Sequence, residues 1–304
     1  LMENIGRVTA HVRSRLSEQT GRNPDRETLT LVPTREGATY LHKDGEYWRC
    51  YLFIEEAASY DEARGPEQAR EAARAFGEFQ RLLRDLPPPP LHETIPDFHH
   101  TPERFETLLD AIRRDPENRA KNARGQIAFA EKRHHITSVL IDAKKAGKLP
   151  ERVTHNDTKL NNVMIDDRTG RGVCVIDLDT VMPGLVLYDF GDQVRSTACT
   201  GAEDDPDLGN VRFRMDLFEA LVQGYLETAG AFLTTAEKGF LAFCGRLITF
   251  EIGIRFLTDY LEGDVYFKTR RPGQNLDRTR VQFARTRAME ENMEKMEATV
   301  ERYI

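Results

Sequence analysis

Hydrophobic residues recur at the spacing of an α-helix over most of this chain. Because side chains three and four residues apart share one face of a helix, this spacing predicts helices with one buried face. A proline near the start of the second segment, and a glycine followed by a proline at the end of the fourth, mark helix boundaries. The predicted helices cover about residues 1–17, 65–86, 102–114 and 117–147, and almost the whole chain from 188 onward.

Strand-like sequence is confined to two regions. In the first, runs at 28–33, 38–43 and 46–54 are rich in β-branched and aromatic residues, and the Asp-Gly pair between the last two predicts a hairpin. In the second, short apolar runs between residues 152 and 177 alternate with a polar loop and a polar turn. A Pro-rich stretch at 87–100 is the best candidate for a linker.

These patterns together predict an α+β fold in two parts. Residues 1–60 contain the opening helix and the strand-rich runs. Residues 61–304 form a large, mainly helical lobe with one embedded β-hairpin. The sequence shows no internal repeat, so a repeat architecture is excluded.

Composition excludes two classes of function. Apolar residues make up 39% of the 304 residues and no apolar run approaches about 18 residues, so we expect no membrane span. The net charge is −7 with both signs mixed, whereas a nucleic-acid-binding protein usually concentrates basic residues on one surface. The four cysteines are scattered without a CxxC pair, and no signal peptide is visible. We therefore expect a cytoplasmic protein with reduced thiols; a monomer is favoured.

Charged and amide residues are concentrated in a short loop between two strand-like runs. This loop, HNDTKLNN at 155–162, has the pattern H-x-D-x-K-x-x-N. Asp157 is placed to accept a proton from a substrate hydroxyl, and a general base of this kind contributes roughly 10² to 10⁴ in rate. Lys159 suits a phosphate, and the side-chain oxygen of Asn162 suits a hard cation such as Mg²⁺. Taken singly, His155 is a brace for the loop and Asn162 an ordinary turn residue.

An apolar strand that follows the loop ends in Asp177. The turn DDRTGRG before this strand predicts a hairpin, in which Asp166 and Asp167 are turn residues. The hairpin brings Asp177 beside Asn162, so that both can share a metal ion while Asp157 faces the acceptor. An Asp-x-Asp pair at a strand end is common and by itself weak, but the whole combination supplies the parts that phosphoryl transfer needs.

At these residues the chain resembles the protein-kinase-like small-molecule kinases of the aminoglycoside phosphotransferase type. HNDTKLNN is similar to their catalytic loop, VIDLD to their metal-binding segment and LVLYDFGD to the motif that follows. The chain also resembles the N-acetylhexosamine 1-kinases through LMENI, YLFIEEAASYD, LHETIPDFH and FEIGIRFLTDYLEGDVYF. This resemblance covers nearly the whole chain and implies a protein-kinase-like fold.

The resemblance implies a role for each matching position. It makes Asp157 the catalytic base, Lys159 a γ-phosphate contact, Asn162 and Asp177 the Mg²⁺ ligands, and Asp189 a support of the catalytic loop. It places Phe53, Ile54, Glu55 and Glu56 in the hinge under the adenine of ATP, and Arg255 and Tyr266 against the sugar. From the residues alone, Arg255 is equally an ion-pair partner of Glu251 or Asp259, each four positions away, and Tyr266 is equally a core residue.

The sequence departs from the family pattern at its beginning. A Gly-rich phosphate loop and a strand lysine are expected before the first long helix, and here that helix starts at residue 1. The N-terminal lobe is therefore expected to be incomplete. Two interpretations stay open: a truncated copy of an active kinase, or a protein that at most binds Mg²⁺ and sugar weakly.

Three functions follow. The first is an ATP- and Mg²⁺-dependent kinase that phosphorylates the anomeric hydroxyl of N-acetylglucosamine or N-acetylgalactosamine. The second keeps the chemistry and changes the acceptor to an amino alcohol or an aminoglycoside, for which an Arg255 side chain pointing into the pocket is unfavourable. The third is a non-catalytic nucleotide- or sugar-binding module.

Overall fold

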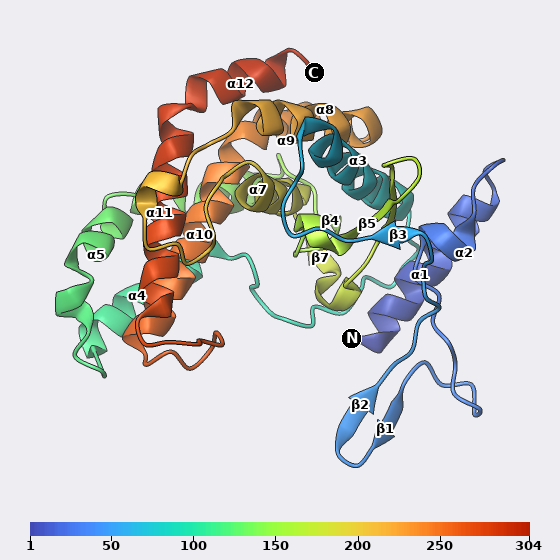
Figure 1. Ribbon diagram of the computed structural model, residues 1–304, viewed down its shortest axis with the longest axis horizontal. Helices are drawn as coiled ribbons and strands as arrows, with labels where there is room; N and C mark the ends of the chain where they lie inside the picture. The colour runs from blue at the N-terminus through green and yellow to red at the C-terminus, as the bar shows by residue number, and fades with distance from the viewer.

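The computed structural model describes residues 1–304, and most of the chain is helical (Figure 1). The helices are α1 (Met2–Ser17), α2 (Pro24–Glu27), α3 (Pro66–Leu83), α4 (Thr101–Arg114), α5 (Arg124–Glu131), α6 (Val139–Lys145), α7 (Val186–Thr197), α8 (Met215–Ala229), α9 (Thr235–Gly239), α10 (Leu241–Leu261), α11 (Gln274–Glu291) and α12 (Met293–Glu301). No helix is both long and apolar enough to span a membrane.

The strands are short and form three small antiparallel sheets. They are β1 (Leu41–Lys43), β2 (Glu46–Trp48), β3 (Ala57–Ala58), β4 (Arg152–Thr154), β5 (Val163–Asp166), β6 (Gly172–Val175) and β7 (Met182–Gly184). β1 pairs with β2, β4 with β7, and β5 lies between β3 and β6. The predicted α+β organisation, the first hairpin and the embedded hairpin are thus confirmed.

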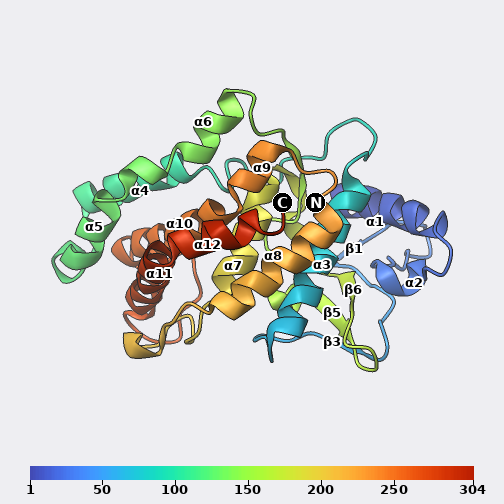
Figure 2. The ribbon, with the colours of Figure 1, turned by 90° about the horizontal axis from the view of Figure 1, so that it is seen from above.

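The elements are spread between two ends of the molecule. In both views α1, α2 and the strand β1 lie at one end, and α4, α5 and α11 lie at the other, with α3, α7 and α8 between them (Figure 1, Figure 2). One large apolar core of 42 buried residues joins helices of the second end and the middle. A second core of 20 residues packs α1 against α3 and the β5–β6 hairpin. The division of the chain at residue 60 stays a prediction.

Helices α3 and α8 lie unusually close together because glycines face the neighbouring helix. A Cβ atom on Gly224 would clash with the backbone of Arg70, and one on Gly77 would clash with Thr228. Close approach lets polar groups on the two helices meet: the Tyr225 hydroxyl donates to the side-chain oxygen of Gln80 at 2.5 Å. The amide of Gln80 is therefore fixed, and it points toward the loop described below.

Several expected elements differ from the sequence prediction. The nearly continuous helix expected from 188 onward is interrupted at 198–214 and 262–273, where the chain forms no α-helix. The single helix expected over 117–147 is divided into α5, α6 and the short 3₁₀ turns Ala120–Asn122 and His134–Ile136, although the chain does leave the helix at Gly147 with φ +70°. The run 28–33 makes only one bridge, Leu31 to Tyr51. Pro33 has no N–H and cannot extend that ladder, so the run ends there.

Candidate active site

The loop that follows β4 is held by hydrogen bonds to Asp189 on α7. One carboxylate oxygen of Asp189 accepts the backbone N–H of Asn156 at 2.7 Å, and the other accepts that of His155 at 2.9 Å and the Gln80 amide at 2.6 Å. The hydroxyl of Thr158 donates to the Asp189 carbonyl at 2.5 Å. Complete burial raises the pKa of Asp189, while these N–H donors stabilise its charged form. These hydrogen bonds are the kind of contact that the expected support of the loop by Asp189 requires.

His155 connects the loop to the strand end opposite. Its Nε2 lies 2.8 Å from the carbonyl oxygen of Ile176, and its Nδ1 accepts the backbone N–H of Asp157 at 3.2 Å. These partners assign the hydrogen to Nε2 in a neutral ring. The ring is buried edge-on against Phe76 and Phe79. His155 is therefore placed as a brace, as the sequence predicted, and it ties the Asp157 backbone to the residue before Asp177.

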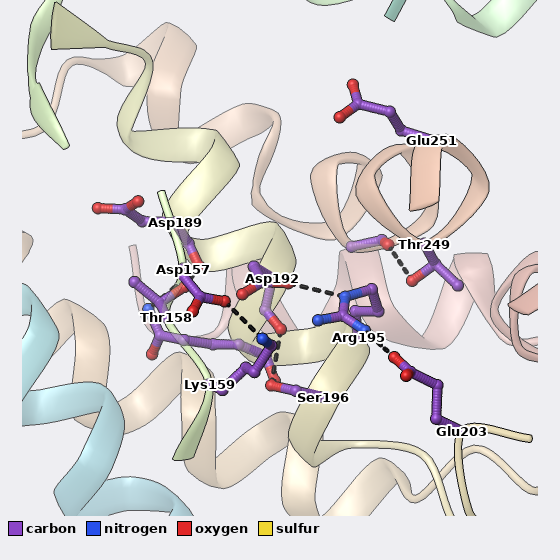
Figure 3. Close-up of polar contacts among 12 residues, drawn as sticks. Asp157, Thr158, Lys159, Asp189, Asp192, Arg195, Ser196, Glu203, Thr249 and Glu251 are labelled. Atoms are coloured by element: carbon purple, nitrogen blue, oxygen red, sulfur yellow. Dashed lines mark hydrogen bonds and ion pairs between the residues drawn. The ribbon is translucent and has the colours of Figure 1, made fainter. Parts of the chain in front are cut away.

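Asp157 is held by two neighbours in its own loop, Lys159, which Figure 3 labels, and Asn162. Lys159 Nζ lies 2.9 Å from one carboxylate oxygen, and the Asn162 side-chain amide donates to the other at 3.1 Å. Burial opposes the charge of Lys159, but the nearby carboxylates of Asp157 and Asp192 outweigh it and raise the pKa of Lys159. The lysine is thus a full positive charge beside the carboxylate.

Asn162 directly precedes β5 and Asp177 lies two residues after β6, so both are at the same end of the β5–β6 hairpin. The backbone N–H of Ile176 donates to the Asn162 carbonyl at 2.9 Å, and Asp177 is the next residue, exposed and in the left-handed conformation at φ +58°. No donor within the chain reaches the Asn162 side-chain oxygen or the Asp177 carboxylate. Free hard oxygen donors of this kind fit Mg²⁺, which usually keeps water and phosphate oxygens as its other ligands. No group of three His, Cys, Asp or Glu side chains forms a complete metal cage.

The expected hinge residues lie outside the cavity that Asp157 lines. Phe53 is 83% exposed, and Ile54 is buried in the second core. The carbonyl groups of Glu55 and Glu56 accept hydrogen bonds from Arg26, and Glu56 also accepts the Asp167 N–H at 3.0 Å. The structure does not bring these four residues together with the catalytic loop, and their contact with adenine stays a prediction.

A wide hollow of 930 Å³, to which the sequence analysis assigned no residue, is lined by Asp179, two residues after Asp177. It is bounded by α1, the β1–β2 hairpin and Asp179. Arg49 closes one side with an ion pair to Asp179 at 2.6 Å. Arg49 precedes the recognised motif by more than a hundred positions, and no local pattern in the sequence marks this contact.

Four of the predicted residues line one cavity of 460 Å³: Asp157, Lys159, Arg255 and Tyr266. The Arg255 guanidinium lies over the rings of Phe98, Tyr266 and Phe267, with 5.3 to 5.8 Å from its central carbon to the ring centres. It lies 3.5 Å from the Tyr266 hydroxyl and forms no ion pair.

The alternative readings of Arg255 and Tyr266 are wrong. Glu251 bonds instead with His99 at 2.8 Å, and Asp259 accepts the backbone N–H groups of residues 265, 266 and 267 at 2.7 to 3.0 Å. Asp259 thereby holds the turn that carries Tyr266, whose side chain is 66% exposed and so does not belong to the core. Both carboxylates are used elsewhere, and Arg255 is left facing the cavity.

Positive charge predominates in this cavity. Five cationic side chains and three carboxylates line it: Lys159, Arg195, Arg255, Lys268 and Arg278 against Asp157, Asp192 and Glu203. Three of the cations have a carboxylate within 4.0 Å, and two, Arg255 and Lys268, have none. The excess favours a neutral or anionic ligand over a cationic one.

The fold and this loop-and-hairpin site together define a kinase-like small-molecule phosphotransferase. Residues 27–233, more than half of the chain, match the APH family, described as the phosphotransferase enzyme family. The chain belongs to this family. The resemblance seen in the sequence is thus confirmed at the level of the family, and transfer of a phosphoryl group to a small molecule is the coarse function that it shows.

Solved structures confirm the fold. The microcompartment-associated aminopropanol kinase is 15% identical, with a TM-score of 0.57 over 96% of this chain and 82% of the other. An aminoglycoside phosphotransferase from Alicyclobacillus acidocaldarius is 13% identical, with a TM-score of 0.60 over 98% and 84%. A spectinomycin phosphotransferase in complex with ADP and spectinomycin is 13% identical, with a TM-score of 0.52 over 93% and 82%. At such low identity the likeness establishes the kinase-like fold and leaves the acceptor open.

Proposed function

We propose that this protein transfers the γ-phosphoryl group of ATP to the anomeric hydroxyl of an N-acetylhexosamine, N-acetylglucosamine or N-acetylgalactosamine. The observation that carries the proposal is the single cavity shared by Asp157 and Arg255, because it combines a base with an unpaired cation. It brings the residues expected to react and the residues expected to hold the sugar within one enclosure. The motif resemblance to N-acetylhexosamine 1-kinases supports the same acceptor.

In this proposal Asp157 takes the proton of the acceptor hydroxyl. The acceptor oxygen forms a bond to the γ-phosphorus, the bond from that phosphorus to the bridging oxygen breaks, and ADP leaves. Asp157 is oriented for this step by the Asn162 amide and the His155 ring. Lys159, 2.9 Å from Asp157, offers its charge to the transferred group.

The residues that would hold Mg²⁺ are Asn162, through its free side-chain oxygen, and Asp177. Bound there, the ion neutralises charge on the phosphate oxygens. The β5–β6 register holds the two ligands on facing strand ends, so their spacing does not depend on a flexible loop. Asp189 positions the whole loop through the backbone of His155 and Asn156.

The cavity charge supports a sugar over an amino alcohol. A cationic acceptor is expected to seek unpaired carboxylates or an open aromatic cage, whereas here the three rings already enclose the Arg255 guanidinium. An uncharged acetamido or hydroxyl oxygen is complementary to an arginine donor. The names of the similar structures, which include an aminopropanol kinase and a spectinomycin phosphotransferase, keep the amino-alcohol class as the second candidate.

The test is phosphoryl transfer from labelled ATP by the full-length product of the gene. N-acetylglucosamine and N-acetylgalactosamine are compared with aminopropanol, choline and spectinomycin at equal concentrations. We expect the label in a hexosamine product that is no longer a reducing sugar, because the phosphate occupies its anomeric oxygen. We expect no labelled product with Asp157→Asn. Transfer to an amino alcohol with none to a hexosamine overturns the sugar assignment. Transfer to no acceptor, with nucleotide still bound, favours the binding module.

A cytoplasmic location and a monomeric state stay predictions.

A further inference from the structure

Two polar atoms that line the acceptor side of the site are buried without any partner. They are one carboxylate oxygen, Oδ2, of Asp192 and Nε2 of His99. Asp192 is 4% exposed and His99 is 6% exposed, and both belong to the cavity of Asp157 and Arg255. A buried polar atom with no hydrogen bond costs about 1–3 kcal/mol, so two in one cavity call for an explanation.

The Asp192 carboxylate is fixed in place by its other oxygen. Oδ1 accepts Arg195 Nε at 2.7 Å, and Arg195 also lies 3.7 Å from Glu203. In Figure 3 Asp192 lies between the Asp157–Lys159 pair and Arg195. Burial opposes the charge of Asp192, but Arg195 and Lys159 outweigh it and lower its pKa, so the free oxygen is a hydrogen-bond acceptor.

The His99 ring is fixed in the same manner by Glu251 on α10. Nδ1 lies 2.8 Å from one Glu251 oxygen, and the Thr101 hydroxyl donates to the other at 2.5 Å. Although burial acts against it, the His99 and Thr101 contacts lower the pKa of Glu251, which is therefore a carboxylate and requires a hydrogen on Nδ1. Nε2 is then the one nitrogen of the ring without a partner, on a residue that lines the cavity.

We propose that Asp192 and His99 form a second subsite of the acceptor cavity, which binds hydroxyl groups of the acceptor other than the reacting one. The inference rests on the proposed function in one respect, that the cavity holds the acceptor. Two preoriented polar atoms without partners are complementary to hydroxyl groups, which both donate and accept, and a polyhydroxylated sugar supplies hydroxyl groups at fixed positions on its ring. The pair would thus determine specificity, while Asp157 determines the reaction.

The energetic reason is the cost of an unpaired buried group. An acceptor that lacks the matching hydroxyl leaves Asp192 or His99 unsatisfied in the complex as well, and sites of this kind discriminate strongly against the incomplete analogue. A quaternary ammonium compound such as choline carries no N–H and only one hydroxyl. It cannot satisfy either atom while its hydroxyl faces Asp157.

The experiment pairs Asp192→Asn with N-acetylhexosamines that lack one hydroxyl at a time, at carbon 3, 4 or 6. We expect one analogue to lower kcat/KM of the wild type roughly tenfold to a hundredfold, and Asp192→Asn to lower it similarly with the complete sugar. For that analogue, the loss from the missing hydroxyl and the loss from Asp192→Asn should not add, because both changes remove the same contact. For the other analogues, the two losses should add. Additive losses with all analogues overturn the contact, because a merely structural role weakens every acceptor alike.

Two substitutions of His99 test the second half of the subsite. Asparagine places its amide near the position of Nδ1, so it keeps the hydrogen bond to Glu251 but has no atom at the position of Nε2. Glutamine reaches the position of Nε2 but loses the hydrogen bond to Glu251. We expect His99→Asn to raise the acceptor KM with little loss of stability, and His99→Gln to keep more of the acceptor affinity and unfold more easily. The reverse order overturns the role of Nε2. Glu106→Gln, on the exposed face of α4, is the control.

Binding by isothermal titration calorimetry separates this inference from the proposed function. If the wild type phosphorylates hexosamines and the losses from Asp192→Asn and from every deoxy analogue add, the subsite is refuted and the proposed function stands. A wild type that binds hexosamines without turnover refutes the function, and the same cycle on binding constants still tests the subsite. A wild type that neither binds nor phosphorylates a hexosamine refutes both.

Discussion

The side-chain amide of Asn162 donates to both the carbonyl and the carboxylate of Asp157, at 2.8 and 3.1 Å. One amide thus fixes the direction of the proposed base relative to its own backbone. The backbone carbonyl of the same residue accepts the N–H of Ile176, the residue before Asp177. The proposed base and the proposed metal site are therefore coupled through Asn162. Substitutions at either one should lower the activity, and only the dependence of the rate on Mg²⁺ should tell their effects apart.

Asp157→Asn should abolish most of the activity without unfolding the protein. The amide cannot take a proton, and loss of a general base costs roughly 10² to 10⁴ in rate. We expect kcat to fall by this factor, with the KM for ATP and the thermal unfolding midpoint nearly unchanged. Steady-state kinetics and a melting curve provide the measurement. An unchanged kcat would show that another group accepts the proton.

Asn162→Ala should change the Mg²⁺ requirement. The substitution removes one proposed ligand and one of the groups that orient Asp157, so kcat falls and the Mg²⁺ concentration at half-maximal rate rises, roughly tenfold to a hundredfold. A Mg²⁺ titration at saturating ATP gives both quantities. Asp157→Asn is the matched comparison, because it should lower kcat and leave the Mg²⁺ midpoint in place.

Asp189→Ala should destabilise the protein and the loop together. The backbone N–H groups of His155 and Asn156 would be left buried without acceptors, at a cost of about 1–3 kcal/mol for each. Urea unfolding followed by circular dichroism measures the loss. Asp167→Ala, on an exposed turn, is the control and should stay within about 0.5 kcal/mol of the wild type.

Arg255→Met should weaken acceptor binding while leaving stability intact. The guanidinium is partly desolvated and has no carboxylate partner, and burial, although opposed by Glu251, lowers its pKa. Methionine keeps the contact with the three rings and removes the charge. We expect the acceptor KM to rise roughly tenfold to a hundredfold, as loss of a charged hydrogen bond implies, with an unchanged ATP KM. A drop in stability with an unchanged acceptor KM would return Arg255 to a structural role.

Stability should fall in acid through carboxylates that are charged in the fold. Hydrogen bonds from the Thr169 hydroxyl and backbone, with Arg26 beside them, lower the pKa of Asp166. A carboxylate with a lowered folded pKa stabilises the fold above its unfolded pKa, near 4, and this contribution is lost as the pH falls. We expect the urea midpoint to decrease from pH 5 to pH 3, and Asp166→Asn to make that decrease shallower. Asp167→Asn should not change the slope.

Sequence reasoning located the parts of the site that lie close together in the chain. The loop from His155 to Asn162 and the hairpin to Asp177 form within 23 residues, and the turn chemistry between them determines which side chains meet. The positions of Asp157, Lys159 and Asn162 therefore followed from a local pattern. Asp167 was correctly placed in a turn, whereas Asp166 is the last residue of β5, and its contact with Arg26, 140 positions earlier, was not foreseeable.

The residues that the sequence did not reveal are joined across long separations. His99 meets Glu251 over 152 positions, and the surrounding stretch was interpreted as a linker because prolines dominate it. Asp192 is the last residue of the recognised motif LVLYDFGD, yet nothing in its neighbours shows that one oxygen stays unpaired. Helical spacing likewise predicts one helix over 117–147. The spacing of apolar residues does not show the positions at which packing against other helices interrupts a helix.

The close contact of α3 and α8 links catalysis to a part of the molecule that touches no substrate. Gly77 and Gly224 set the distance between the helices, Tyr225 fixes Gln80, and Gln80 donates to the carboxylate that carries the catalytic loop. A mutation that pushes the helices apart would be eliminated by selection for activity even where the fold survives it. Over evolutionary time, these two glycines should therefore change as slowly as the loop itself, in step with it and more slowly than the rest of the core.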